Sequence, residues 1–211
     1  MVDRYKRGGY IKTKRVEEAI MAVPRELFMD PRYREYAYYD QPFAIPGDGR
    51  QTISAPYMYP VTYEPLQLEP GQRFLEIGAG SGYGAAIARE LVGPEGLVVT
   101  VEINPETYRF AEKNLREAGY NDVFVVLGDG TLGYPELAPY DAVSITASTP
   151  DIPPPIYKQM AEHGRVIAPV GGRGFYGQDL LLVEKKGGEF VKKSLMGVVY
   201  VPLIGKYGYP G

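Results

Sequence analysis

The stretch Phe74-Leu75-Glu76-Ile77-Gly78-Ala79-Gly80-Ser81-Gly82-Tyr83 is a short apolar run that leads directly into a glycine-rich turn. The apolar run is typical of a buried strand, and the residues after the turn continue with helical spacing. Glycines allow the chain to turn tightly, and they allow a ligand to lie against bare backbone where a Cβ would obstruct it. The stretch therefore predicts a strand, a turn and a helix that bind a nucleotide-like ligand at the carboxyl end of the strand.

Strands and helices alternate on the carboxyl side of this stretch. The predicted strands are 74–77, 98–103, 123–127, 142–146 and 165–169, and the predicted helices are 84–91, 106–118 and 156–162. This alternation is typical of right-handed crossovers in a parallel sheet. Two more strands, 180–184 and 198–203, follow without a helix between them, and Lys185-Lys186-Gly187-Gly188 predicts a hairpin turn. The predicted fold class is α/β, with a doubly wound, mostly parallel, Rossmann-like sheet that ends in an antiparallel hairpin.

An N-terminal extension precedes the predicted sheet. Apolar residues recur at helical spacing between Thr13 and Val23, and Pro24 then ends the predicted helix. Residues 29–50 are rich in Tyr, Pro, Gly and Asp without a clean period, which favours an irregular segment. We expect a single domain over residues 1–211. Within it, residues 1–66 would form a helical and active-site segment, and residues 67–211 the cofactor-binding sheet.

The composition excludes several classes of function. Cysteine is absent and His163 is the single histidine, so disulfides, thiolate metal sites and multi-histidine metal sites are excluded, and we expect no bound metal. A net charge of −3 provides no overall attraction to nucleic acid. No apolar run approaches the ~20 residues that cross a bilayer. Since the basic first residues also lack the apolar stretch of a secretory signal, we expect a cytoplasmic protein without a nucleic-acid or membrane partner.

Three carboxylates follow three successive predicted strands. Glu76 ends the first strand, Glu102 ends the second, and Asp129 follows the third. Glu102 is placed to accept hydrogen bonds from ribose hydroxyls, and Asp129 to accept one from an adenine amino group. Glu76 would repel a pyrophosphate but attract an ammonium or a sulfonium. Since S-adenosyl-L-methionine carries both of these cations, it is the expected cofactor.

Other interpretations of the glycine-rich turn stay open at this point. Gly80-x-Gly82-x-x-Ala85 nominally matches a dinucleotide fingerprint, against which the charge of Glu76 argues. The glycines alone are also compatible with close packing of strand on helix, and each carboxylate alone with a solvated loop. The joint placement of the three carboxylates at one edge of the sheet favours a cofactor site.

Segments outside the glycine-rich turn carry a more specific pattern. Residues 51–58 read Gln-Thr-Ile-Ser-Ala-Pro-Tyr-Met, and residues 196–203 read Met-Gly-Val-Val-Tyr-Val-Pro-Leu. Together with residues 75–83, Gly128-Asp129-Gly130 and Ala138-Pro139-Tyr140-Asp141-Ala142, they resemble the protein-L-isoaspartate O-methyltransferase family. The Thr-Ile-Ser-x-Pro and Val-Pro-Leu segments are specific to that family, and the resemblance covers most of the chain.

This resemblance implies transfer of a methyl group from S-adenosyl-L-methionine to the free carboxylate of L-isoaspartyl residues in damaged peptides and proteins. The product of the cofactor would be S-adenosyl-L-homocysteine, and the family expectation is a monomer. Ser54 resembles the family's active-site serine and is the expected catalytic residue. The expected cofactor-binding residues are Thr52, Ile53, Ser54, Ala55, Tyr57, Glu76, Gly78, Ala79, Gly80, Ser81, Glu102, Ile103, Asp129, Gly130 and Ile204.

The sequence departs from the family pattern near this serine. Arg50 stands where an uncharged residue or a histidine is usual, and Pro60 and Pro65 would each bend the helix that follows Ser54. Ser54 is also a candidate N-cap for that helix. Elsewhere, His163 is expected at a helix C-terminus, where an imidazole suits the helix dipole.

Two alternative functions are compatible with the cofactor half of the sequence. The first is S-adenosylmethionine-dependent methylation of RNA or of another protein side chain. The acidic balance, and the lack of an Asn/Asp-Pro-Pro-aromatic motif after the fourth strand, argue against methylation of base amino groups. The second is a binding module that holds a cofactor without catalysis, and the intact Thr-Ile-Ser segment argues against it.

Overall fold

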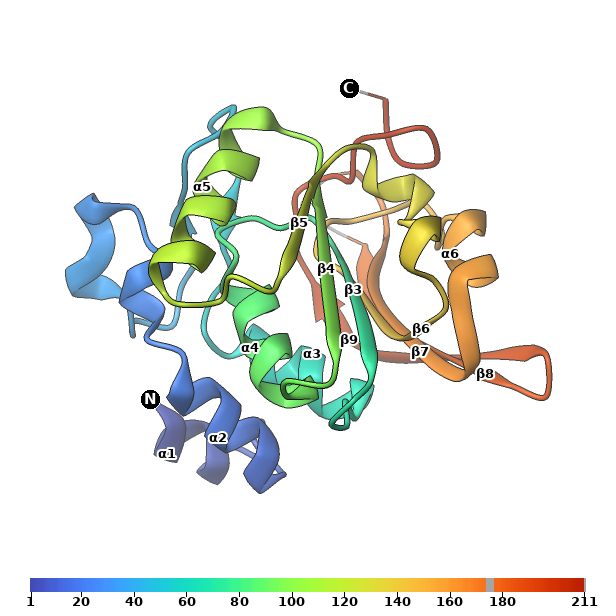
Figure 1. Cartoon of the computed structure of the whole chain (residues 1–211), viewed down its shortest axis with the longest axis horizontal. Coiled ribbons are helices and arrows are strands. Elements are labelled where there is room, and N and C mark those ends of the chain that lie inside the picture. Colours follow the sequence, from blue (N-terminus) through green and yellow to red (C-terminus); the bar gives the residue numbers. More distant parts are fainter. Residues whose placement is uncertain (174–176, 211) are drawn as a thin grey trace.

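A seven-stranded sheet forms the centre of the molecule (Figure 1). The computed structural model describes residues 1–173 and 177–210. The strands of the sheet are β3 (Arg73–Ile77), β4 (Leu97–Glu102), β5 (Phe124–Leu127), β6 (Tyr140–Ile145), β7 (Met160–Gly171), β8 (Gln178–Lys186) and β9 (Glu189–Val198). Their order across the sheet is β5-β4-β3-β6-β7-β8-β9. Pairing is parallel from β5 to β7, whereas β8 is antiparallel to both β7 and β9. The predicted doubly wound sheet with a terminal antiparallel hairpin is confirmed.

The strand order changes direction between β3 and β6. After β3 the chain adds β4 and β5 on one side, and it then returns to add β6 and β7 on the other. Ile77, at the end of β3, lies level with Val101 of β4 and Ile145 of β6. Ligands of such sheets bind beyond the carboxyl ends of the strands at this change of direction. The residues that follow Ile77 therefore enter the place where a ligand is expected.

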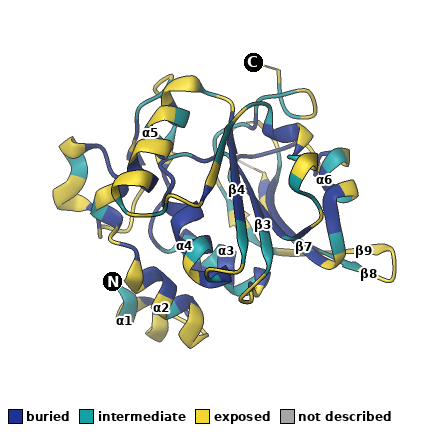
Figure 2. Ribbon diagram, in the orientation of Figure 1, coloured by how far each residue is buried: buried dark blue, intermediate teal, exposed yellow. Residues whose placement is uncertain are grey.

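Helices cover the two faces of the sheet unequally (Figure 1). The helices α3 (Met58–Leu66), α4 (Tyr83–Val92) and α5 (Pro105–Glu117) lie over one face, and α6 (Pro154–Gln159) lies over the other. Small, fully buried side chains such as Ala85 and Ala88 let α4 approach the strands closely. Two apolar cores result, and the strands β3, β4 and β6 between them are almost wholly buried (Figure 2).

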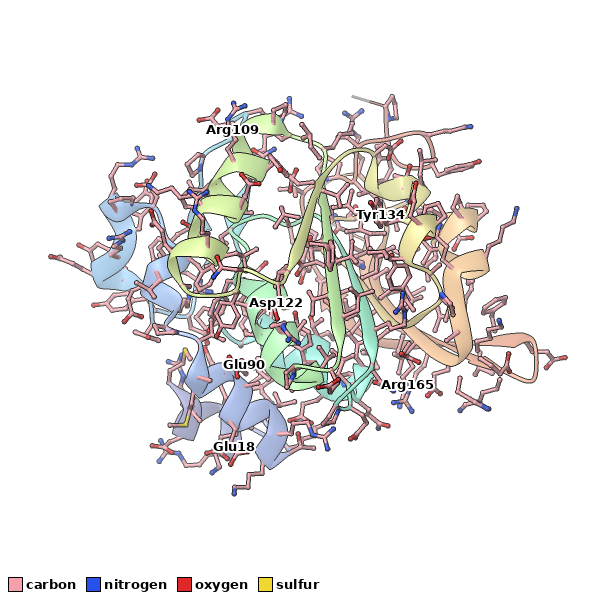
Figure 3. All side chains as sticks on the ribbon, viewed as in Figure 1. Glu18, Glu90, Arg109, Asp122, Tyr134 and Arg165 are labelled. Atoms are coloured by element: carbon pink, nitrogen blue, oxygen red, sulfur yellow. The ribbon has the colours of Figure 1, made fainter. Side chains whose placement is uncertain are left out.

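The N-terminal extension packs on the face that α4 covers. Its elements are α1 (Val2–Arg7), α2 (Lys14–Ala22), the 3-10 helices η1 (Arg25–Phe28) and η2 (Pro31–Tyr36), and the two-residue strands β1 (Phe43–Ala44) and β2 (Thr52–Ile53). Thr13 caps α2 by accepting a hydrogen bond from the Val16 amide, at 3.3 Å. Apolar side chains of α2 join the core beneath α4, while charged ones such as Glu18 point outward (Figure 3). Residues 29–50 hold only short elements, as the sequence predicts.

The predicted helix 156–162 is too long. The structure ends α6 at Gln159 and begins β7 at Met160. Tyr140 pairs with Met160 and Ala142 with Arg165, so the residues between Met160 and Arg165 form a bulge opposite one residue of β6. His163 lies in this bulge with a φ of 67°, exposed to solvent, and the predicted position at a helix C-terminus is wrong. The pairing of β6 with β7, which no local pattern reveals, overrides the helical spacing.

The predicted last strand, 198–203, is also misplaced. The hairpin turn lies at Gly187 and Gly188, as predicted, but the strand after it runs over Glu189–Val198. Its first residues are exposed and mostly polar because β9 is an edge strand with little apolar surface to bury. Residues 199–204 instead cross the carboxyl edge of the sheet, where Pro202 forms an isolated bridge with Ser148.

Two short 3-10 helices, η3 (Gly130–Leu132) and η4 (Pro135–Leu137), connect β5 to β6. Over residues 1–173 and 177–210, no helix has the length and apolar character that crossing a bilayer would require.

Candidate active site

The glycine-rich turn lies at the carboxyl end of β3. Gly78, Gly80 and Gly82 have φ values of 95°, 55° and 86°, which residues with a Cβ rarely adopt. A Cβ on Gly78 would also collide with Oγ1 of Thr146, and that hydroxyl donates to the carbonyl oxygens of Ile77 and Gly78. The turn therefore has a backbone shape that favours glycine.

A cleft of about 630 Å³, counted with its solvent-open part, lies beyond the ends of β3 and β4. Side chains and backbone from the predicted set form much of its wall. The predicted residues that line it are Thr52, Gly78, Gly80, Glu102, Ile103, Gly130 and Ile204. The C-terminal segment 201–204 forms the opposite wall. The structure thus brings these residues, which are distant in the sequence, together around one cleft.

Glu102 is the carboxylate best placed for a ligand in this cleft. Its Oε2 accepts a hydrogen bond from the Gly80 amide at 3.2 Å, and its Oε1 accepts one from the Asn104 amide at 3.0 Å. Burial raises the pKa of this carboxyl, while the backbone hydrogen bonds oppose the rise. Each carboxylate oxygen can accept a further hydrogen bond. Glu102 can therefore accept a pair of hydroxyl donors from a ligand.

Asp129 lies beside the cleft but is not among the residues that line it. Its Oδ1 accepts from both the amide and the hydroxyl of Thr131, at 2.9 and 2.7 Å, and its Oδ2 accepts from the Lys206 amide at 2.8 Å. The carboxylate thus ties the C-terminal segment to the end of β5. Gly130, its neighbour, is the residue of this motif that lines the cleft.

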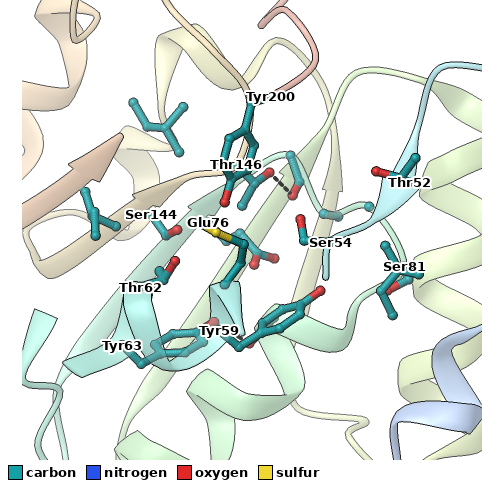
Figure 4. Close-up of a pocket in the computed structure, with 18 of the residues that line it drawn as sticks. Thr52, Ser54, Tyr59, Thr62, Tyr63, Glu76, Ser81, Ser144, Thr146 and Tyr200 are labelled. Carbon is teal, nitrogen blue, oxygen red and sulfur yellow. Dashed lines mark hydrogen bonds between the residues drawn. The ribbon is translucent and has the colours of Figure 1, made fainter. Parts of the chain in front are cut away.

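A second hollow continues inward from this cleft, since both share Thr52, Gly78, Gly80 and Thr146 (Figure 4). Glu76 lies at its base with 3% of its surface exposed, and Thr100 donates a hydrogen bond of 2.7 Å to it. Burial is the main cause that raises the pKa of Glu76 to about 8. A cationic group in this hollow would favour the ionised form of Glu76.

Ser54 lines the same hollow, next to the end of β2 (Figure 4). The hydroxyl interacts with the Tyr200 side chain, which opposes the strong rise that burial causes in the pKa of Tyr200. The Ser54 carbonyl accepts a hydrogen bond of 2.7 Å from Arg25. Both the backbone and the side chain of Ser54 are therefore held by other residues.

The alternative role of Ser54 as a helix cap is wrong. The helix α3 begins at Met58, and its N-cap is Tyr57, without a side-chain capping bond. Pro60 is the third residue of α3, where the backbone has no amide bond to lose, and α3 continues through Pro65 to Leu66.

The remaining predicted residues have different positions. Ile53, Ala79 and Ser81 line the inner hollow, whereas Ala55 and Tyr57 do not. Tyr57 packs on Tyr10 instead, with ring centroids 5.8 Å apart. Arg50, the departure from the family pattern, lies on an exposed turn, where its amide donates to Asp48.

Several residues that line the inner hollow were not predicted from the sequence. They are Met58, Tyr59, Thr62, Tyr63, Gly84, Ser144, Ile145, Thr146, Ile167, Leu180 and Tyr200. Ser144 and Thr146 follow the same carboxyl-end rule as Glu76, and applying that rule to the fourth strand would have found them. Tyr200 lies in the segment of residues 196–203, whose sequence indicates the family but does not by itself indicate a residue of the site.

The family model described as protein-L-isoaspartate(D-aspartate) O-methyltransferase matches residues 1–208. The chain belongs to this family. A relative from Korarchaeum cryptofilum, named protein-L-isoaspartate O-methyltransferase, is 46% identical over 217 residues, with 99% of this chain and 97% of the relative covered. A relative of the same name from Methanothrix thermoacetophila is 50% identical over 197 residues, with 93% and 91% covered.

Solved structures agree with these relatives. One, named protein-L-isoaspartate O-methyltransferase, has a TM-score of 0.87 and 31% identity, and the match covers 99% of this chain and 67% of that one. Another is a Plasmodium falciparum protein assigned to the same enzyme, solved in complex with S-adenosyl-L-homocysteine. It has a TM-score of 0.85 and 25% identity, with 96% of each chain covered. The family resemblance stated from the sequence is confirmed over the whole length of the match.

Proposed function

We propose that this chain uses S-adenosyl-L-methionine to methylate the free carboxylate of L-isoaspartyl residues in proteins, with Ser54 orienting that carboxylate. The chain is a protein-L-isoaspartate O-methyltransferase by family, and its methyl donor is S-adenosyl-L-methionine. The observation that supports the role of Ser54 is its position in a polar hollow continuous with the cofactor cleft.

The donor set of the cleft fits this cofactor. Glu102 offers two carboxylate oxygens at the end of β4, where ribose hydroxyls would be bound. Gly78 and Gly80 leave backbone free of side chains above the cleft. Glu76 offers a buried carboxyl to a cationic group in the inner hollow. A carboxylate pair with bare backbone between them suits a neutral ribose and a positive methionine moiety better than a pyrophosphate.

The reaction needs no general base. An isoaspartyl carboxylate, with a pKa of about 4, is already ionised at neutral pH. When bound, S-adenosyl-L-methionine would supply an electrophilic methyl group, with S-adenosyl-L-homocysteine as the leaving group. The protein's task is to hold that oxygen in line and to exclude water, because the two opposite charges neutralise each other in the transition state. His163 is exposed in the β7 bulge and lines neither hollow, so it has no part in this scheme.

Ser54 is the side chain that we assign to orientation. Its hydroxyl can donate to the substrate carboxylate or to a neighbouring peptide group without forming a covalent intermediate. Asp129, in this proposal, contributes through its hold on the C-terminal segment, which closes the cofactor cleft. The protein substrate is common to the family, and we further propose a cytoplasmic, monomeric enzyme with one domain and no nucleic-acid or membrane partner.

A labelled-methyl assay tests the function. The purified chain should transfer label from S-adenosyl-L-methionine to a short peptide that contains L-isoaspartate, and not to the same peptide with normal aspartate. Mild alkali should release the label as methanol, since the product is a methyl ester. If the chain binds the cofactor but labels neither peptide, the substrate proposal fails, and RNA and other protein side chains become the next substrates to test.

Glu76 should make cofactor binding release a proton. In the free protein its pKa is raised to about 8, so its carboxyl is protonated at pH 7. A cation bound in the inner hollow favours the ionised form. We expect close to ~1 proton released per S-adenosyl-L-homocysteine bound at pH 7, and less above pH 8. Calorimetry in two buffers of different ionisation enthalpy measures this release.

The same residue predicts how stability depends on pH. A carboxyl with a raised folded-state pKa binds more protons when folded, so its contribution to the free energy of unfolding is present below pH 4.5 and is lost as pH rises to about 8. Glu76→Gln should remove both this slope and the proton release. If the free energy of unfolding of Glu76→Gln depends on pH as it does in the parent protein, other groups cause that dependence.

A further inference from the structure

Arg25 is a fully buried cation that touches the backbone of Ser54. It begins η1, directly after Pro24, and none of its surface is exposed. Its Nε donates to the carbonyl oxygen of Ala37 and its Nη2 to that of Ser54, each at 2.7 Å. One guanidinium therefore joins the N-terminal extension to the serine of the inner hollow.

Two aromatic rings that contact each other, with centroids 4.6 Å apart, also lie near this guanidinium. Its central carbon lies 5.7 Å from the ring centroid of Tyr59 and 5.3 Å from that of Tyr83. Tyr59 belongs to α3 and lines the inner hollow, whereas Tyr83 begins α4 directly after the glycine-rich turn. Arg25 thus contacts α3 and the start of α4 as well as the backbone of Ser54.

The charge of Arg25 is not neutralised by a carboxylate. Within the described residues it forms no ion pair, and its Nη1 has no hydrogen-bond partner. A buried, unpaired cation costs free energy, and an apolar side chain would fill the same space without that cost. The guanidinium is therefore poorly explained as a residue that only fills the core.

We propose that Arg25 is a positioning residue for methyl transfer, which fixes the carbonyl of Ser54 and through it the direction of the Ser54 hydroxyl. Two donors in a rigid fork can hold the Ala37 and Ser54 carbonyls in fixed relation, which a flexible ammonium cannot do. The hydroxyl then meets the substrate carboxylate at one angle. This inference rests on the role proposed above for Ser54.

The test compares Arg25→Lys with Ser54→Ala and with the double variant. Arg25→Lys should lower kcat/KM for the isoaspartyl peptide about tenfold, because a small misplacement of an orienting group is enough for that loss. Its Kd for S-adenosyl-L-homocysteine should stay within about threefold of the parent, which places the loss in the peptide step. The double variant should be no slower than Ser54→Ala alone, since Arg25 acts through the hydroxyl.

Arg73 provides the matched control. It also donates to two backbone carbonyls, those of Leu137 and Pro139, but at the amino end of β3 and away from both hollows. Arg73→Lys should leave kcat/KM for the peptide unchanged. Arg25→Met, which keeps an unbranched side chain next to the rings but has no donors, should lose at least as much activity as Arg25→Lys.

The test distinguishes a failure of the proposed role of Ser54 from a failure of the proposed role of Arg25. If Ser54→Ala is fully active, the proposed role of Ser54 is wrong. If Ser54→Ala is slow but the losses of the two single variants multiply in the double variant, Arg25 does not act through Ser54. If both Arg25 variants fail to bind S-adenosyl-L-homocysteine, Arg25 is needed for the fold as a whole, and its assignment as a positioning residue is overturned.

Discussion

Glu102→Ala is expected to weaken the binding of S-adenosyl-L-homocysteine by about 100-fold or more. Each carboxylate oxygen already accepts one backbone amide, and each has capacity for a ligand hydroxyl. Hydrogen bonds to a charged group contribute about 1.5–3 kcal/mol each, so the loss of two supports a change of this size. The variant also leaves the Gly80 amide without its acceptor, which loosens the glycine-rich turn. Calorimetry with S-adenosyl-L-homocysteine measures the change in Kd.

Glu106→Ala is the control for Glu102→Ala. Glu106 lies in the first turn of α5 and is exposed, so its removal changes the net charge equally without touching the cleft. Glu106→Ala should bind S-adenosyl-L-homocysteine with the same Kd as the parent protein. Glu102→Gln should lie between the two, because the amide keeps one acceptor oxygen. A Glu102→Ala protein with parental affinity would show that the ribose is bound elsewhere.

The parts of the site that the sequence predicted are those with local determinants. The apolar run of β3 predicts a buried strand by itself, and the glycines after it adopt positive φ values where the chain must turn. The ends of successive parallel strands meet at one edge of the sheet, so Glu76 and Glu102 could be placed near one another without a structure.

Contacts between distant segments could not be predicted in this way. Asp129 has the right position in the sequence for a ligand contact, but its carboxylate is bound by the Lys206 amide, 77 residues further along the chain. Arg25 looks like an ordinary surface arginine after Pro24, and only its contacts in the folded structure, among them those with Tyr59 and Tyr83, reveal its burial. Burial of a charged side chain is decided by tertiary packing, which residue type does not encode.

The last strand of the sheet could not be predicted from the sequence for the same reason. Apolar residues at 198–203 predict a strand, but Val201, Pro202 and Leu203 line the cofactor cleft and do not belong to a strand of the sheet. The polar residues of β9 pair with β8 through backbone hydrogen bonds, which any residue except proline can form. The hydrophobic pattern of a sequence indicates which residues are buried, but it does not indicate which segment of the protein covers them.

Ser54→Ala should lower kcat/KM for the isoaspartyl peptide by about 10- to 100-fold, which corresponds to the loss of one hydrogen bond to a charged group. The hydroxyl lies in the inner hollow, beside Tyr200, where a substrate carboxylate would meet the methyl group. The Kd for S-adenosyl-L-homocysteine should change by less than about threefold, because Glu102 and the glycine backbone remain. Initial rates with labelled cofactor, together with calorimetry, separate the two quantities.

Ser148 supplies the control for this substitution. It is a fully buried serine whose hydroxyl donates to the Gly172 carbonyl, and it lines neither hollow. Ser148→Ala should therefore keep the parental rate, although both variants remove one hydroxyl. If Ser54→Ala loses cofactor affinity and turnover together, the hydroxyl shapes the cofactor cleft and the orienting role is wrong. If only turnover falls, the remaining activity reports what in-line placement and exclusion of water achieve without the serine, as expected for a nucleophile that is ionised before it binds.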